Sequence, residues 1–388
     1  MIKPTRWTRY AIKDHVAPGE GFRDLFVEAI QAHAFVSHAS PEDASTAVGW
    51  CHANDLLATD FSDPGDWSFG PYIVLGLRMD RRKVPAALLR ASIAAALRDW
   101  CARNDRDRCP SAVKTEIKEG VTRGLLRTTI PHASVVPVAW NIQDGTVILG
   151  THAEGDIGLC RLLFKNTFGH LPFEIMPVDG LDEEAAEALG TLGYASELAA
   201  EFLAWAWSRA QMGHGSITLN ADGDTCEWWI DDRVGLAPER ELRPQTTVKG
   251  DRVSESATLL GAFAEGEKVR TARLGLRRSD REYTVTLATE ALRIGSAKMP
   301  RSSAGDRVED LHLRMFGVEE VHAILDAMFA AFAADRISDR WGQHAGSVAT
   351  YMGQWAAAKF DIAEDGQVRL FSTPAAEPAK AKKGKSRG

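Results

Sequence analysis

The chain has 388 residues, more than one hydrophobic core usually organises, so we expect two or more subdomains. Hydrophobic residues make up 45% and charged residues 26%, as in soluble globular proteins, and there is neither an apolar run of membrane-spanning length nor the apolar segment of a signal peptide. The five cysteines are widely spaced without a Cys-x-x-Cys pair, which predicts a reduced cytoplasmic protein that uses cysteines as small core residues.

The N-terminal region is expected to begin with a strand at 6–12 and an amphipathic helix at 20–33. In this helix Phe22, Phe26 and Ile30 recur at helical spacing. These residues would give the helix one apolar face to bury.

A continuous apolar strand at 72–77 leads into a cationic turn and then into two helices. The first helix follows Pro85, and the second starts near Ser111, whose hydroxyl can act as an N-cap. Two strands come next, at 135–142 and 146–151, and an Asp-Gly pair between them is a hairpin signal.

This hairpin is followed by a helix at 156–168 and a strand at 173–178. The β-β-α-β order resembles a ferredoxin-like unit. It predicts an α+β class with antiparallel or mixed sheets and flanking helices, rather than a doubly wound sheet. The acidic, glycine-interrupted stretch at 179–193 marks the end of this first domain.

Beyond that boundary a tryptophan-bearing helix at 196–212 precedes a hairpin, a short helix and a strand at 268–278. Trp205 and Trp207 have the chemistry to stack on unpaired bases. The helix has only Arg209 among its own cations, however, so we expect its tryptophans to pack in a core or a dimer interface.

Two helices, at 307–316 and 318–337, are expected to pack as an αα pair, and a lysine-rich tail ends the chain. The composition of the tail predicts disorder, with either nonspecific electrostatic attraction or mere solubility as its role. The sequence thus predicts four parts: an N-terminal α+β domain at 1–180, a Trp helix with a β-rich domain at 181–300, a C-terminal helical region at 301–371 and a disordered basic tail at 372–388.

Positive charge is concentrated between Arg78 and Arg127. This stretch holds thirteen Lys or Arg against six Asp or Glu, a net charge of +7 in a chain of net charge −7, so the rest carries −14. Such segregation costs folding free energy through self-repulsion, so an anionic partner, here a nucleic-acid backbone, explains it better than fold stability does. For any single cation a solvated surface position is an equal alternative. The candidate cations for binding a nucleic-acid backbone are Arg78, Arg81, Arg82, Lys83, Arg98, Lys114, Lys118 and Arg123, with a smaller second set at Lys268, Arg270 and Arg273.

Four sequence blocks carry a family resemblance. They are VLGLRMDRRKVPAALLR at 74–90, KTEIKEGVTRGLLR at 114–127 with VAWNI at 138–142, EFLAWAWSR at 201–209 and AEGEKVRTARL at 264–274. In this order they resemble the longer members of the RdgC family of recombination-associated proteins. No single block is a chemical signature, and the resemblance depends on their collinear order. Shorter family members have a Leu-Leu-Pro-Arg-like turn where this chain has Leu125-Leu-Arg127, so the resemblance adds Arg127 to the DNA-binding candidates.

The resemblance implies a protein that is not an enzyme and that binds double-stranded DNA. It further implies a homodimer that closes into a ring around the duplex and restrains the RecA recombinase. The expected location is cytoplasmic and associated with the nucleoid, with no membrane partner. Because contacts to phosphates read no bases, binding should be largely independent of sequence.

Enzyme signatures are missing from the sequence, which has no His-Glu-x-x-His, Gly-x-Ser-x-Gly or P-loop motif. The three aspartates at 60–66 lack regular ligand spacing and predict a solvated turn. We therefore expect no cofactor and no metal. Two alternatives stay open: a module that contacts recombinase without a DNA site of its own, and a metal-dependent nuclease whose carboxylates come from distant positions.

Overall fold

The computed structural model describes residues 5–19, 21–37, 46–175, 177–190, 195–211, 213–219, 223–238, 241–251, 253, 256–290, 292–300, 307–338, 341, 360–362 and 368–370. The chain divides into two compact units. The first comprises Met1–Asp179, Arg281–Thr286 and Arg293–Ala323, and the second Gly180–Asp280, Leu287–Leu292 and Ile324–Gly388. The chain therefore alternates between the units beyond Asp280. The predicted basic tail at 372–388 lies outside the described residues.

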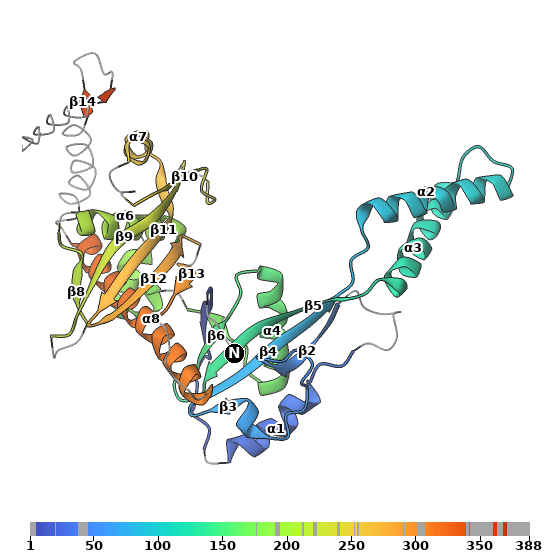
Figure 1. Ribbon diagram of the computed structural model, residues 1–388, viewed down its shortest axis with the longest axis horizontal. Coiled ribbons are helices and arrows are strands. Elements are labelled where there is room, and N and C mark those ends of the chain that lie inside the picture. The colour runs from blue at the N-terminus through green and yellow to red at the C-terminus, as the bar shows by residue number, and fades with distance from the viewer. Residues whose placement is uncertain are drawn as a thin grey trace, which may run out of the picture. The chain divides into compact units, whose positions relative to one another are not determined.

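A seven-stranded antiparallel sheet organises the first unit (Figure 1). Its strand order is β2-β4-β5-β6-β1-β7, with β3 paired to β4. The elements of this region are β1 (Thr8–Ala11), α1 (Phe22–Ala32), β2 (Thr46–His52), β3 (Ser68–Phe69), β4 (Tyr72–Arg81), α2 (Ala86–Arg103), α3 (Ser111–Thr128), β5 (His132–Asn141), β6 (Thr146–Leu149), α4 (Glu154–Phe168) and β7 (Phe173–Glu174). The last strand is shorter than predicted and pairs with β1, so the β-β-α-β segment is part of a larger sheet.

The core of this sheet is rich in aromatic residues. Ile30 of α1 and Phe164 of α4 are buried against sheet residues, and the Trp140 ring of β5 lies 5.5 Å from Phe26 and 5.2 Å from Phe164. Aromatic side chains bury large areas, so these contacts supply much of the stability of the unit. The apolar face predicted for the first helix is confirmed.

The predicted hairpin between β5 and β6 is also confirmed. Gly145 has a φ of +79°, the left-handed conformation that a tight turn requires and that glycine adopts without steric cost. The carboxylate of Asp144 accepts a hydrogen bond from the Thr146 amide at 2.8 Å and so closes the turn.

A six-stranded sheet has the strand order β10-β9-β11-β12-β13, with β8 paired to β9. The elements of the later chain are α5 (Glu183–Gly190), α6 (Ala195–Gln211), β8 (Ser216–Thr218), β9 (Thr225–Ala237), β10 (Thr246–Lys249), α7 (Ala257–Ala264), β11 (Lys268–Arg278), β12 (Arg281–Ala288), β13 (Arg293–Lys298), α8 (Arg307–Ile337), β14 (Phe360–Ile362) and β15 (Val368–Leu370). The two sheets and their helices confirm the α+β class. Among the described residues, no helix combines the length and apolarity needed to cross a bilayer.

The tryptophan-bearing helix α6 packs on β9 and β11 in the second unit. Trp205 and Trp207 are buried, and the indole N–H of Trp205 donates to the Asp335 carboxylate at 2.9 Å. Phe202 and Phe332 complete this aromatic cluster at ring distances of 5.7 Å from each other and about 6 Å from Trp205. These tryptophans are therefore core residues and cannot stack on bases in this conformation.

The prediction of two packed helices near the C-terminus is wrong, because α8 is one continuous helix of 31 residues. Its interruption was expected at Gly317, but a glycine inside a helix costs only about 1 kcal/mol relative to alanine. A Cβ at Gly317 would lie 3.4 Å from the Met299 sulfur and 3.5 Å from the Tyr283 ring, so the glycine lets the helix approach these side chains.

Acid is expected to weaken the first unit through His322 of α8. Its Nε2 accepts a hydrogen bond from the buried Trp7 indole N–H at 2.8 Å, and desolvation holds the pKa of His322 well below 6.5. A folded pKa below the unfolded value means that the unfolded chain binds more protons, so stability falls as pH drops below about 6.5. The loss should approach about 1.4 kcal/mol per pH unit.

Urea midpoints measured between pH 7 and pH 5 test this expectation. His322→Gln cannot titrate, so its stability should depend less steeply on pH than that of the parent chain. Equal pH dependence of the two proteins would show that His322 does not contribute.

Candidate nucleic-acid interface

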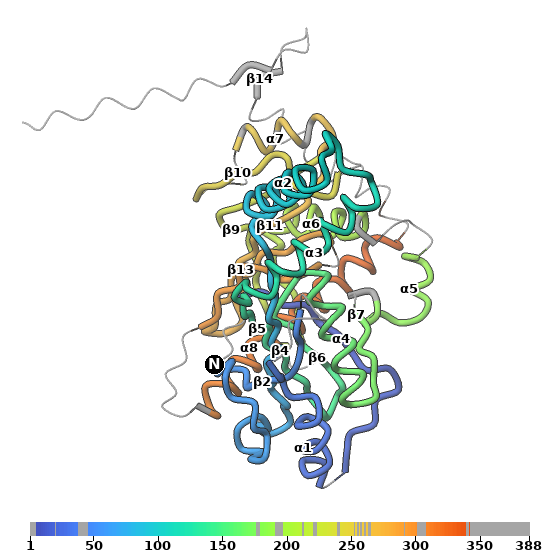
Figure 2. Tube along the Cα trace, turned by 90° about the vertical axis from the view of Figure 1, so that its right-hand side faces the viewer, coloured from blue at the N-terminus to red at the C-terminus, as the bar shows by residue number. Residues whose placement is uncertain are grey.

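The predicted basic stretch folds into a helical arm, residues 82–131, inserted into an antiparallel strand pair. β4 and β5 are in register from Tyr72↔Asn141 to Arg81↔His132, and the arm connects these last two partners. In Figures 1 and 2 the chain leaves β4, runs through α2 and returns through α3 to β5. Figure 1 shows both helices beyond the ends of these strands, away from α1 and α4.

Neither helix of the arm has a fully buried residue. The helices pack on each other, and each carries half-buried apolar residues at helical spacing, such as Ile93 and Leu97 in α2 and Ile117 and Val121 in α3. Leu88 remains 50% exposed. The arm therefore presents nearly its whole surface outward, and its polar groups are accessible to a partner.

The surface of the arm is positively charged. It carries eleven Lys or Arg and five Asp or Glu, a net charge of +6. The predicted cations Lys83, Arg98, Lys114, Lys118 and Arg123 are exposed, and no residue in the described parts of the chain forms an ion pair with them. These five side chains can each reach a phosphate without breaking an internal pair. Arg82 is half-buried and Arg127 is exposed.

Arg78, in contrast, is fixed within the sheet. Its guanidinium donates two hydrogen bonds of 2.9 Å to the Asp80 carboxylate and one of 2.8 Å to the Leu56 carbonyl, and it lies 3.9 Å from the Phe35 ring centroid. The bond to Asp80 raises the pKa of Arg78. Arg81 is partly engaged, since it donates to Asp156 at 2.7 Å. Arg78 is therefore not part of the proposed interface, and Arg81 lies at its edge.

The second predicted set, on β11, is also tied up internally. Arg270 is fully buried and paired with Glu197 at 3.2 Å, and Arg273 is 7% exposed and paired with Asp231 at 3.1 Å. Both guanidinium groups are buried, so moving either one out to a phosphate would break its ion pair and disrupt the packing around it. Lys268 is half-buried. This set is not part of the interface that we propose.

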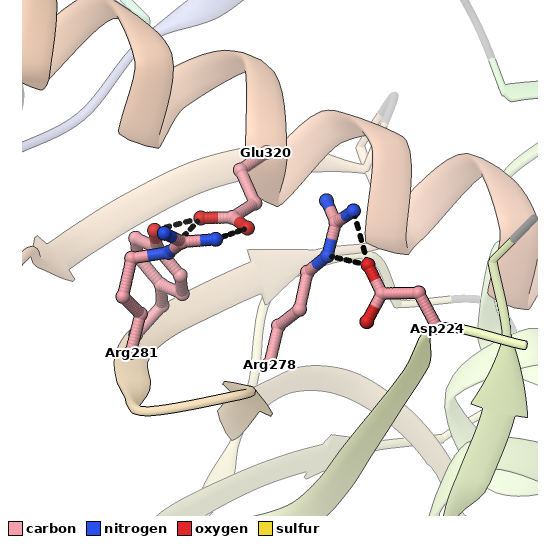
Figure 3. Close-up of polar contacts among 5 residues, drawn as sticks. Asp224, Arg278, Arg281 and Glu320 are labelled. Atoms are coloured by element: carbon pink, nitrogen blue, oxygen red, sulfur yellow. Dashed lines mark hydrogen bonds and ion pairs between the residues drawn. The ribbon is translucent and has the colours of Figure 1, made fainter. Parts of the chain in front are cut away.

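Two carboxylates near the six-stranded sheet, those of Glu320 and Asp224, pair with arginines and are not grouped as metal ligands would be (Figure 3). Glu320 of α8 is buried, receives two hydrogen bonds from Arg281 at 2.8 and 2.9 Å, and accepts another from Tyr283. Asp224 accepts from Arg278 at 2.7 Å. Among the described residues, no group of three or more His, Cys, Asp or Glu is placed to hold a metal ion.

No family model matches the chain. No curated protein matches it either.

Proposed function

We propose that this protein binds double-stranded DNA through the arm, without sequence preference and without cleaving it. The observation that carries the proposal is the combination of a net charge of +6 with five exposed cations that have no ion-pair partner among the described residues. Lysine and arginine at such positions neutralise phosphates and release counterions, which drives nonspecific binding. Neither helix needs to unfold or repack to make these contacts.

The acting species in this proposal is a homodimer that forms a ring, with the two arms contacting opposite sides of one duplex. A symmetric dimer doubles the number of phosphate contacts with the same side chains. We propose that occupancy of DNA by this nucleoid-associated dimer restrains RecA-dependent recombination. The RdgC resemblance supports the dimer, the ring and the effect on recombination. The β-β-α-β order of the first sheet separately supports a ferredoxin-like relationship.

Linear and nicked circular duplexes incubated with the protein, with and without Mg²⁺, test the proposed function. The expected result is retarded DNA of unchanged length in both conditions. Degradation in Mg²⁺ would instead indicate a nuclease. DNA that is neither retarded nor cleaved would favour a module that contacts recombinase and has no DNA site. Either degradation or the absence of retardation would reject the proposal.

A further inference from the structure

Two of the five thiols lie at the tip of the arm. Cys101 is in the last turn of α2, and Cys109 lies in the connection just before α3. Both are unpaired and partly exposed, whereas Cys51, Cys160 and Cys226 are buried. Only the two tip cysteines therefore combine closeness in the chain with access to a reagent in solution.

The two tip cysteines lie at the adjoining ends of two helices that pack on each other, and both are half-buried. Cys101 follows Ile93 and Leu97 at four-residue spacing and is half-buried like them, so it lies on the same face of α2 as these two residues. The amide of Arg106 donates to the Cys101 carbonyl at 3.0 Å, so the connection folds back over the end of α2. Cys109 is half-buried at the start of the returning chain.

The electrostatics of the tip agree with this placement. Desolvation raises the pKa of the Cys109 thiol, the neighbouring Cys101 raises it further, and Lys114 lowers it. One sulfur therefore responds to charge on the other. Because the thiolate is the attacking form, the raised pKa of Cys109 lowers the fraction of this thiol that can attack. Attack by either thiol first leads to the same disulfide.

We propose that Cys101 and Cys109 are a redox modification site that forms a reversible disulfide across the tip of the arm. The oxidant is a low-molecular-weight disulfide of the glutathione type. The Cys101 thiolate attacks one sulfur of this oxidant, forms a mixed disulfide and releases one thiolate. The Cys109 thiolate then attacks the Cys101 sulfur and releases the second. Two protein thiols lose two electrons, the oxidant gains them, and the two protein protons end on the two released thiols.

Such a bond would stabilise the pairing of α2 with α3. The pairing of α2 with α3 depends on half-buried stripes and has no fully buried residue to hold it. A covalent link between the facing ends prevents the helices from separating at the tip, because it constrains the opened state of the hairpin. This inference does not depend on DNA binding, and either can fail without the other.

Trypsin gives a direct test, because its cleavage sites after Arg103, Arg106 and Arg108 lie between the two cysteines. Full-length protein is treated with oxidised glutathione, blocked with N-ethylmaleimide and digested without reductant. We expect peptide 99–103 joined to peptide 109–114, in a species that dithiothreitol separates. In protein that was first reduced, both peptides should instead carry maleimide.

Cys101→Ser and Cys109→Ser serve as matched controls. In each, the linked species should disappear and the remaining tip thiol should carry a glutathione adduct, with an unchanged circular dichroism spectrum. The proposal is overturned if the parent chain yields separate glutathione adducts on both peptides, retains both thiols in excess oxidant, or links two chains through like peptides.

Discussion

Excision of the arm is expected to abolish DNA binding while both sheets remain folded. Replacing residues 82–131 with Asn-Gly joins Arg81 to His132, the last pair in register between β4 and β5, through a two-residue turn. Asn-Gly is the preferred two-residue turn for such a hairpin. The core of the first unit contains no residue of α2 or α3, so its packing should be unaffected. Since the electrostatic contacts supply nearly all nonspecific affinity, we expect the affinity to fall by about a hundredfold or more at low salt.

Gel retardation of a duplex measures this effect, and circular dichroism with the urea midpoint serves as the folding control. A folded excision variant that retains parental affinity would place the DNA-binding surface outside the arm. An unfolded variant would be uninformative about DNA, but the charge variant described next leaves the helices in place.

Reversing four exposed cations of the arm should have the second-largest effect. The variant Arg98→Glu, Lys114→Glu, Lys118→Glu and Arg123→Glu changes the local charge from +6 to −2. Each phosphate contact that is lost reduces the slope of log affinity against log salt by about one unit, so a loss of up to about four units is expected. The slope is obtained from titrations of one duplex at several salt concentrations.

A matched control distinguishes the loss of contacts made by the arm from the effect of changing the total charge of the protein. Lys13, Lys165, Arg243 and Lys249 are exposed cations outside the arm, and their replacement by Glu changes the total charge by the same amount. This control should keep most of the parental salt slope. Equal losses in both variants would mean that long-range attraction, rather than contact with the arm, drives association.

Local sequence signals predicted the elements whose causes are local. The Asp144-Gly145 turn, the apolar face of α1 and the helix with Trp205 all follow from turn chemistry or periodicity within a few residues. The concentration of cations from Arg78 to Arg127 likewise pointed to the arm, because charge is visible in composition. What composition could not show is that 50 residues separate two strands that pair directly.

The prediction that the β11 cations Lys268, Arg270 and Arg273 bind DNA is not supported by the structure, for a different reason. Simple alternation along β11 would place Arg273 on the face opposite Leu274, but the register against β9 shifts between Val269 and Thr271 and again between Ala272 and Leu274. A one-residue shift exchanges the two faces of a strand. At the first shift β11 has one residue more than β9, which is Arg270, and at the second shift β9 has two residues more than β11. The alternation pattern of β11 alone therefore does not predict that both Arg270 and Arg273 are buried. The carboxylates that pair with them, Glu197 and Asp231, lie on other elements, which a reading of β11 alone cannot include.

The insertion of the arm between β4 and β5 also constrains the order in which the first unit folds. Strands separated by 50 residues meet slowly when the intervening chain is a random coil, because closing a long loop costs entropy before any pairing is gained. Helices form in microseconds or less from local contacts, and the pairing of α2 with α3 brings both ends of the insertion together. Early pairing of α2 with α3 thus holds β4 and β5 close together before they pair. Variants that weaken the helix pairing should slow refolding even where they leave the final stability of the sheet unchanged.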